Sequence, residues 1–391
     1  MQITSKLPNV TTTIFTIMSQ LAAKHGAINL SQGYPNFEVD QQLKDLVNHY
    51  IQAGFNQYAP MAGVLALRQA IARKKEVLYG CSLNPKTEIT ITNGATEAIY
   101  STISALVGAG DEVIIFEPAY DSYVPSIEVN GGVVVALRLK SPDFRIDWEQ
   151  VKDAVTPKTR MIMVNSPHNP SGVMLRHEDL AALQEIVADT NILVLSDEVY
   201  QHLIYEGRRH ESALRYPDLF RRSIITMSFG KTFHVTGWRI GYVIAPPEIT
   251  TEIRKVHQSN TFGINRPLQH ALADYLATPE HYLSLPAFYQ QKRDLFFELM
   301  ADTPFEFLEC RGTYFALASY RKISDMGDQE FARWLTREKG VAVIPISSFY
   351  SDGTDEKIVR FCFAKTDKML AAAAEKLVGI EELSPAHSCL V

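Results

Sequence analysis

The sequence lacks the features that mark several classes of protein. No apolar run in its 391 residues approaches the roughly 18 residues of a membrane-spanning helix. The first residues do not place a charged segment before an apolar one, so we expect no secretory signal. Basic residues are not in excess, since 38 Lys and Arg stand against 44 Asp and Glu. We therefore expect neither a membrane nor a nucleic acid as a partner.

Cysteine and metal-ligand motifs are also sparse. The four cysteines, Cys81, Cys310, Cys362 and Cys389, are far apart and none belongs to a CxxC pair. The eleven histidines form no HExxH motif, and no cluster of metal ligands is visible. We therefore expect no metal site and a reducing, cytoplasmic location.

What the sequence does contain is a regular alternation of strand and helix patterns. Runs of four to six mostly β-branched residues, without polar alternation, are typical of strands that are buried on both faces. Such runs lie at 88–92, 112–116, 132–137, 161–165, 192–195, 223–227 and 240–245. Helical patterns separate many of them. This order predicts an α/β fold with a mostly parallel seven-stranded sheet and helices on both faces.

The pattern changes from about residue 275 onward. Long charged helical patterns and short strand-like pieces follow, at 286–301, 314–318, 328–339, 341–344, 358–363 and 366–378. They predict a smaller α+β domain at 276–391, after a large domain at 41–275. The segment 1–40 contains a helical pattern near residues 14–21, and we expect it to pack with the small domain and the substrate pocket.

Ligands of open α/β sheets bind at the carboxyl ends of the strands, so the polar residues that follow each predicted strand are the candidates for a site. These residues lie at 93–96, 117–120, 165–170, 196–200 and 228–231.

Lys231 lies in SFGKT, directly after a predicted strand. A P-loop ends in the same letters, but it requires glycine where this chain has Ile225. A second interpretation is an amine that forms a Schiff base, with Ser228 and Arg239 close enough to hold a phosphate. The remaining alternative is an ordinary surface lysine.

Asp197 and Tyr200 follow the apolar strand 192–195. Asp197 is either the cap of a helix or a carboxylate that pairs with a cationic ring nitrogen. Asn165 and Asn169 lie among prolines in NSPHNPSG, which predicts a rigid turn that is either structural or presents two amides to a ligand.

The segment 93–98 begins a helix directly after a strand. Small residues there leave backbone N–H groups free, and the helix dipole favours an anion. Helices often begin with glycine without any ligand, so this motif alone is not specific.

Together these segments, in this order, resemble the class I/II aminotransferases, which are pyridoxal-5′-phosphate enzymes of fold type I. The resemblance covers roughly residues 10 to 375. Its strongest markers are SFGKTFHVTGWRIGY, VNSPHNPSG, LSDEVY and VRFCFA. The segments IFTIMSQLA, LSQGYPNF and EPAYDSY look most like the branch of methionine and kynurenine aminotransferases.

The resemblance implies roles around the ring of the cofactor. Lys231 matches the catalytic lysine that forms the internal aldimine and then carries a proton at the substrate α-carbon. Asp197 matches the partner of the pyridine nitrogen, which it keeps protonated. Tyr200 and Asn169 match donors to the phenolic oxygen of the ring, and Tyr120 matches the aromatic side chain that stacks on it.

The resemblance also implies a phosphate site and a dimer. Ser228, Arg239 and the backbone N–H groups of Ala95 and Thr96 match the groups that hold the phosphate. Tyr58 matches a tyrosine that reaches the phosphate of the other subunit, which implies a homodimer with shared active sites.

On the substrate side, Arg360 in VRFCFA matches the arginine that binds the α-carboxylate, where a bidentate guanidinium fixes orientation as well as charge. Asn165 and the backbone of Gly33 match groups that assist it. Phe15 matches an aromatic residue of the side-chain pocket, although it could equally be a core residue of a helix.

These matches predict a ping-pong transfer of an amino group from a large uncharged amino acid, such as methionine, an aromatic residue or kynurenine, to a 2-oxo acid. An acidic substrate would need a second cation, and the nearest candidate, Arg266, is expected in a loop. Alternatives are a β-lyase acting on cysteine S-conjugates, another reaction at the α-carbon, or a binding protein without turnover.

Overall fold

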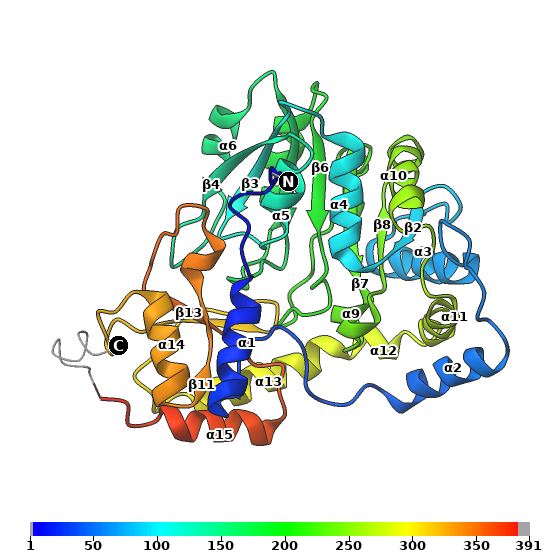
Figure 1. Cartoon of the computed structure of the whole chain (residues 1–391). Coiled ribbons are helices and arrows are strands. Elements are labelled where there is room, and N and C mark those ends of the chain that lie inside the picture. Colours follow the sequence, from blue (N-terminus) through cyan, green and yellow to red (C-terminus); the bar gives the residue numbers. More distant parts are fainter. Residues whose placement is uncertain (1–2, 382–391) are drawn as a thin grey trace.

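The computed structural model describes residues 3–381, and a seven-stranded sheet forms its centre (Figure 1). The strand order is β2-β8-β7-β6-β5-β3-β4. The strands are β2 (Ile89–Thr92), β3 (Glu112–Glu117), β4 (Val133–Arg138), β5 (Thr159–Asn165), β6 (Leu193–Asp197), β7 (Ser223–Ser228) and β8 (Gly241–Ile244). Strand β8 runs antiparallel to β2 and β7, and the other pairings are parallel. The predicted sheet is confirmed, with one antiparallel strand.

Except for the edge strand β4, the strands are buried on both faces, which explains their continuous apolar runs. In β3, Val113 and Ile115 pack in a cluster with helices α4 (Gly94–Leu106) and α5 (Tyr123–Glu128). Ile114, between them, belongs to the core on the opposite face. Alternate residues of one strand therefore hold helices on both faces of the sheet.

Each face has its own set of helices. Helix α10 (Pro247–Asn260) packs beside α4 on one face. The core of the other face contains apolar residues of α3 (Leu65–Tyr79), α6 (Trp148–Ala154) and α7 (His177–Val187). Helix α11 (Arg266–Tyr275) packs against α3 and α2 (Gln41–Gln52). Arg266 is therefore the first residue of a helix, and its expected place in a loop was wrong.

A second, four-stranded sheet is formed by the C-terminal part of the chain. Its order is β12-β13-β10-β9, and all its pairings are antiparallel. The strands are β9 (Glu306–Phe307), β10 (Phe315–Ser319), β12 (Ile344–Pro345) and β13 (Ile358–Cys362). The helices of this part are α13 (Leu285–Leu299), α14 (Asp328–Glu338) and α15 (Asp367–Leu377), close to the predicted positions.

The segment that contains α1 and β1 packs against the last third of the chain (Figure 1). Helix α1 (Ile14–His25) contacts α14, and β1 (Ile28–Asn29) pairs in parallel with β11 (Val341–Ala342). Three short α-helices remain within residues 3–381, α8 (Pro217–Phe220), α9 (Phe229–Thr232) and α12 (Glu280–Leu283). The limits of the three predicted domains stay a prediction.

Within residues 3–381, no helix combines the length and apolar character needed to cross a membrane. Cys81, Cys310 and Cys362 are free thiols, whereas Cys389 lies outside the described residues.

Candidate active site

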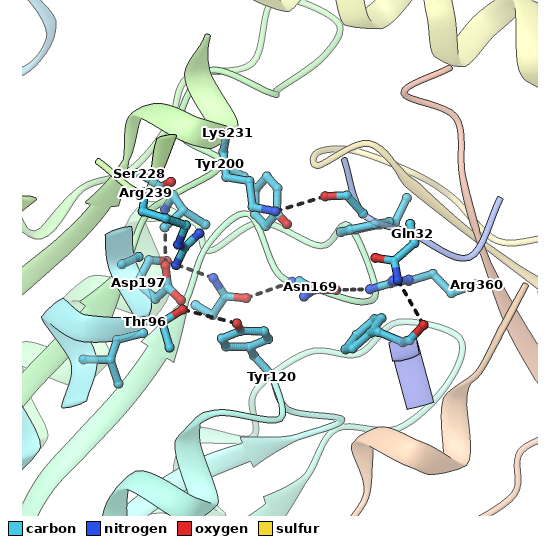
Figure 2. Close-up of a pocket in the computed structure, with 17 residues that line it drawn as sticks. Gln32, Thr96, Tyr120, Asn169, Asp197, Tyr200, Ser228, Lys231, Arg239 and Arg360 are labelled. Carbon is cyan, nitrogen blue, oxygen red and sulfur yellow. Dashed lines mark hydrogen bonds between the residues drawn. The ribbon is translucent and has the colours of Figure 1, made fainter. Parts of the chain in front are cut away.

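One pocket lies where the carboxyl ends of β5, β6 and β7 meet the second sheet. It collects every predicted site residue except Tyr58 (Figure 2). These residues are Phe15, Gly33, Ala95, Thr96, Tyr120, Asn165, Asn169, Asp197, Tyr200, Ser228, Lys231, Arg239 and Arg360. The pocket is also lined by Gln32, Ile99, Val199 and Phe315, which sequence reasoning did not single out.

Lys231 lies in the short helix α9, directly after β7. Its side chain reaches the pocket, and Nζ donates a hydrogen bond of 3.0 Å to the carbonyl of Gly33. Burial lowers the pKa of the amine to about 8. The uncharged fraction of the amine near neutral pH is therefore far larger than in an ordinary lysine, and this form is able to act as a nucleophile.

Asp197 is the last residue of β6 and is buried. Its Oδ2 accepts a hydrogen bond of 2.6 Å from the Tyr123 hydroxyl, and Oδ1 accepts one of 3.3 Å from the Val199 N–H. Burial raises the pKa of the carboxyl group to about 6, although the Tyr123 bond opposes that shift. Sequence reasoning missed Tyr123, which stands in the same EPAYDSY segment as Tyr120.

The first turn of α4 is a candidate anion site. Ala95 and Thr96 line the pocket there, in a helix that is 13 residues long and begins at Gly94. A Cβ at Gly94 would lie 2.7 Å from Nη2 of Arg239, so glycine lets the guanidinium approach the helix start. Arg239 itself has a positive φ of 55°. Free helix N–H groups and a guanidinium together favour a phosphate-sized anion.

Aromatic side chains form two walls. Tyr120 lies at the lower side of the view in Figure 2, while Tyr200 lies beside Lys231 at the upper side. The hydroxyl of Tyr120 is 3.4 Å from Oγ1 of Thr96. Burial raises the pKa of both phenols, so both hydroxyls stay protonated and can donate hydrogen bonds.

The turn after β5 connects Asp197 to Arg360 through a chain of hydrogen bonds. The Asn165 side chain donates to the Asp197 carbonyl at 2.9 Å and accepts from the Asn169 N–H at 2.8 Å. Oδ1 of Asn169 in turn accepts a 2.7 Å bond from Nη1 of Arg360. The predicted rigid turn is therefore held by its own amides, and the Asn169 amide nitrogen stays available as a donor.

Arg360 lies on β13 and is only 1% exposed. Its Nη2 donates to the Ser31 carbonyl at 3.1 Å, and the guanidinium carbon is 3.8 Å from the centre of the Phe315 ring. Burial lowers its pKa to about 10, which still leaves it charged at neutral pH. No carboxylate within residues 3–381 forms an ion pair with it, and Nε has no partner there. A buried cation of this kind favours a carboxylate ligand.

Phe15 projects from α1 beside the arginine. Its ring contacts Phe349 edge-on at 5.9 Å, and the Arg360 guanidinium carbon is 5.2 Å from its centre. Gln32 donates through Nε2 to the Phe15 carbonyl at 2.9 Å, which fixes α1 against the loop before Gly33. Both the pocket and the core contain Phe15, so the two interpretations of this residue do not exclude each other.

Tyr58 lies away from this pocket. Its side chain is 81% exposed and its ring packs against Phe262 at 5.2 Å between centres. Together with Asn56 and Arg266 it lines a separate hollow on the surface. A single chain therefore does not test its predicted contact across a dimer.

The residues of the pocket fit pyridoxal phosphate. A partly uncharged amine matches its aldehyde, and the first turn of α4 with Arg239 matches its phosphate. Burial raises the pKa of Asp197, which forms no ion pair within residues 3–381, and a protonated ring nitrogen beside this carboxylate would offset the cost of burial.

Comparison with known proteins gives the same assignment. The profile of the family Aminotransferase class I and II matches residues 25–377. Methionine aminotransferase of Escherichia coli is 50% identical over 374 residues, which cover 95% of this chain and 97% of that protein. The kynurenine–oxoglutarate transaminase of Dictyostelium discoideum is 34% identical, with 93% of each chain covered.

A solved Escherichia coli structure, reported with a methionine aminotransferase function, has a TM-score of 0.94 and 50% identity. It covers 96% of this chain and 99% of its own. These findings and the geometry of the pocket agree, and the chain belongs to the class I and II aminotransferases, which depend on pyridoxal phosphate.

Proposed function

We propose that the pocket transfers the amino group of a large uncharged L-amino acid to a 2-oxo acid in a ping-pong reaction. The main supporting observation is that the Lys231 amine and the buried Arg360 guanidinium face one cavity, and that neither forms an ion pair with a carboxylate within residues 3–381. This pair matches the two ends of an amino acid, its nitrogen side and its carboxylate. The family and the relatives favour transamination over β-elimination.

The side chains around Lys231 form one end of the pocket, the Lys231 end, and would hold the cofactor. Asp197, supported by Tyr123, would face the ring nitrogen, and Tyr200 and the Asn169 amide would donate to the ring oxygen. Tyr120 would stack on the ring. The first turn of α4, with Ser228 and Arg239, would hold the phosphate. Pyridoxal phosphate supplies the aldehyde that takes up the amino group and the ring that withdraws electrons from the α-carbon.

The chain's own residues would orient the substrate and move its proton. Arg360 would bind the α-carboxylate through its outer N–H groups, with Asn165 and the Gly33 backbone beside it. This contact fixes the α-carbon relative to Nζ of Lys231, which would take up and return the α-proton. Burial of Lys231 keeps part of the amine uncharged near neutral pH, as a proton acceptor must be.

The preference for uncharged side chains rests on the lining of the pocket. Phe15, Tyr120 and Phe315 provide aromatic surface, and no lysine or arginine other than Lys231, Arg239 and Arg360 lines the cavity among residues 3–381. Arg266, the other candidate cation, borders the separate hollow near Tyr58. Methionine, aromatic amino acids and kynurenine therefore fit better than aspartate, in line with the names of the relatives.

We further propose a homodimer with shared sites and a cytoplasmic location. The exposed Tyr58 and Phe262, with Phe262 53% exposed, form an aromatic pair on the surface that supports a contact with a second subunit. Sedimentation of the active enzyme tests this, since an active monomer would contradict it. The free thiols Cys81, Cys310 and Cys362 support a reducing compartment.

The specificity is tested by comparing kcat/KM for L-methionine and L-aspartate with one shared 2-oxo acid. We expect methionine to be favoured by at least about tenfold, because aspartate would bring an unpaired carboxylate into an aromatic pocket. A higher kcat/KM for aspartate would contradict the proposed substrate class.

A further inference from the structure

We propose that Lys365 is a positioning residue that aims the N–H of Gly33 at the substrate carboxylate. This inference rests on the proposed carboxylate site at Arg360 and adds a residue to it. Lys365 lies just after β13, five positions beyond Arg360, and is only 2% exposed. Neither sequence reasoning nor the lining of the pocket includes it.

The ammonium group of Lys365 is bound entirely by the loop that carries Gly33. Its Nζ donates to the Gln32 carbonyl at 3.2 Å and to the Tyr34 carbonyl at 2.7 Å. It also lies 4.6 Å from the centre of the Tyr34 ring. It forms no ion pair with a carboxylate in the part of the chain that the structure describes. The cost of burying it is therefore offset by two carbonyl dipoles and one aromatic face.

The neighbouring carbonyls of the same loop are bound as well. The Ser31 carbonyl accepts from Arg360, and the Gly33 carbonyl accepts from Lys231 at 3.0 Å and from the Tyr314 hydroxyl at 2.6 Å. Four consecutive carbonyls, those of residues 31–34, thus accept hydrogen bonds from side chains. Each peptide plane of this loop has its orientation fixed by a side chain that comes from a distant part of the chain.

One peptide bond links the carbonyl that Lys365 binds to the N–H of Gly33. The Gln32 carbonyl and the Gly33 N–H belong to one planar trans unit, so they point in opposite directions. Holding the carbonyl on Lys365 therefore fixes the direction of the N–H. That N–H makes no hydrogen bond to any group of residues 3–381, and Gly33 lines the pocket that Arg360 also lines. The pocket therefore has both this donor and the Arg360 cation, which has no ion-pair partner in the same residues, and the combination suits a carboxylate.

The loop has little room to settle in another position. A Cβ on Gly33 would lie 2.8 Å from the Phe315 ring, the same ring that stacks on Arg360. The backbone at Gly33 therefore lies directly against the Phe315 ring, which also contacts the Arg360 guanidinium. A rotation of the Gln32–Gly33 peptide would turn the N–H away from the carboxylate.

The test compares Lys365→Met with the wild-type holoenzyme. Methionine fills the same space without a donor, so we expect KM for L-methionine and for L-alanine to rise equally, by about tenfold. We expect kcat to stay within about twofold and the visible absorbance of the bound cofactor to stay unchanged. Lys368→Met, at an exposed position of α15, is the matched control and should have the wild-type KM.

A substrate without a carboxylate separates positioning from a general structural defect. 3-(Methylthio)propylamine is methionine without that group, and its single-turnover rate should be the same in Lys365→Met and wild type. An equal loss for this amine, or an unchanged KM for both amino acids, would overturn the proposal. If Lys365→Met does not fold, Lys365→Leu, which also lacks a donor, replaces it, and a KM below about twice the wild-type value there would overturn the proposal equally.

Arg360→Ala distinguishes this inference from the proposed function on which it rests. If Arg360→Ala raises KM and Lys365→Met does not, only the role of Lys365 is wrong. If neither variant raises KM, the carboxylate site itself is wrong.

Discussion

The two ends of the pocket are built in different ways. The Lys231 end uses residues that directly follow neighbouring strands of one sheet, so each is placed by the strand before it. The Arg360 end joins the loop at residues 31–34 to β13, and its bond to Ser31 connects residues that are 329 positions apart. The Lys231 end is therefore fixed by one sheet, whereas the Arg360 end depends on contacts between distant segments.

We therefore expect that a substitution at one end can abolish the function of that end and leave the other end intact. The largest effect is expected at the Lys231 end. Lys231→Ala removes the nucleophile and proton carrier, so kcat should fall by at least about 10³-fold. Binding of the substrate carboxylate should persist, because Arg360 is untouched.

Steady-state rates and equilibrium binding of L-methionine to the variant with cofactor check both statements. Lys255→Ala, on the outer surface of α10, is the control and should behave as the wild type. Turnover near the wild-type rate in Lys231→Ala would refute the role given to this lysine.

The opposite break is Arg360→Ala. Losing a desolvated charge-assisted contact costs about 2–5 kcal/mol, so KM should rise by at least about 30-fold for amino acids and 2-oxo acids alike. The visible absorbance of the holoenzyme should not change. Arg360→Lys keeps the charge but not the bidentate guanidinium, and its KM should lie between those of the wild type and Arg360→Ala. An unchanged KM for both substrates would count against the carboxylate site.

A smaller effect is expected from Tyr123→Phe, which removes the hydrogen bond to Asp197. That bond lowers the pKa of Asp197, so its loss raises the pKa and leaves less carboxylate at a given pH. The acid limb of kcat/KM should move to higher pH, by up to about one unit, and activity near pH 6 should fall by about three- to tenfold.

The pH profile of kcat/KM is the measurement, with Tyr100→Phe on α4 as a control of the same chemistry at a half-exposed position. A shift of the acid limb to lower pH, or none, would show that Tyr123 does not support the charged form of Asp197.

The smallest effect is expected at the contact between Gln32 and Phe15. Gln32→Leu removes the bond that holds the Phe15 carbonyl while keeping a similar volume. We expect kcat/KM for methionine to fall by about two- to fivefold, and that for alanine, which does not reach Phe15, to stay unchanged. Equal losses for both amino acids would place Gln32 at the carboxylate instead of at the side-chain pocket.

The same comparison explains what could be predicted from the sequence. Six of the seven strands could be located because burial on both faces leaves continuous apolar runs, and the edge strand β4 because its residues are mostly β-branched. The Lys231 end follows from polar residues at the ends of the strands. Tyr123 was missed because its partner Asp197 lies 74 positions away and no local pattern joins them. Lys365 and Phe315 were missed for the same reason, since only folding places them against the Gly33 loop.

The most direct test of the account is a half-reaction recorded in the absence of any 2-oxo acid. After mixing the holoenzyme with L-methionine, the visible absorbance should disappear with one 2-oxo product formed per site, and adding a 2-oxo acid should restore it. This result would show that the Lys231 end and the Arg360 end act on one amino acid. Continuous product formation without an acceptor, with the absorbance maintained, would instead indicate elimination and contradict the proposed transfer.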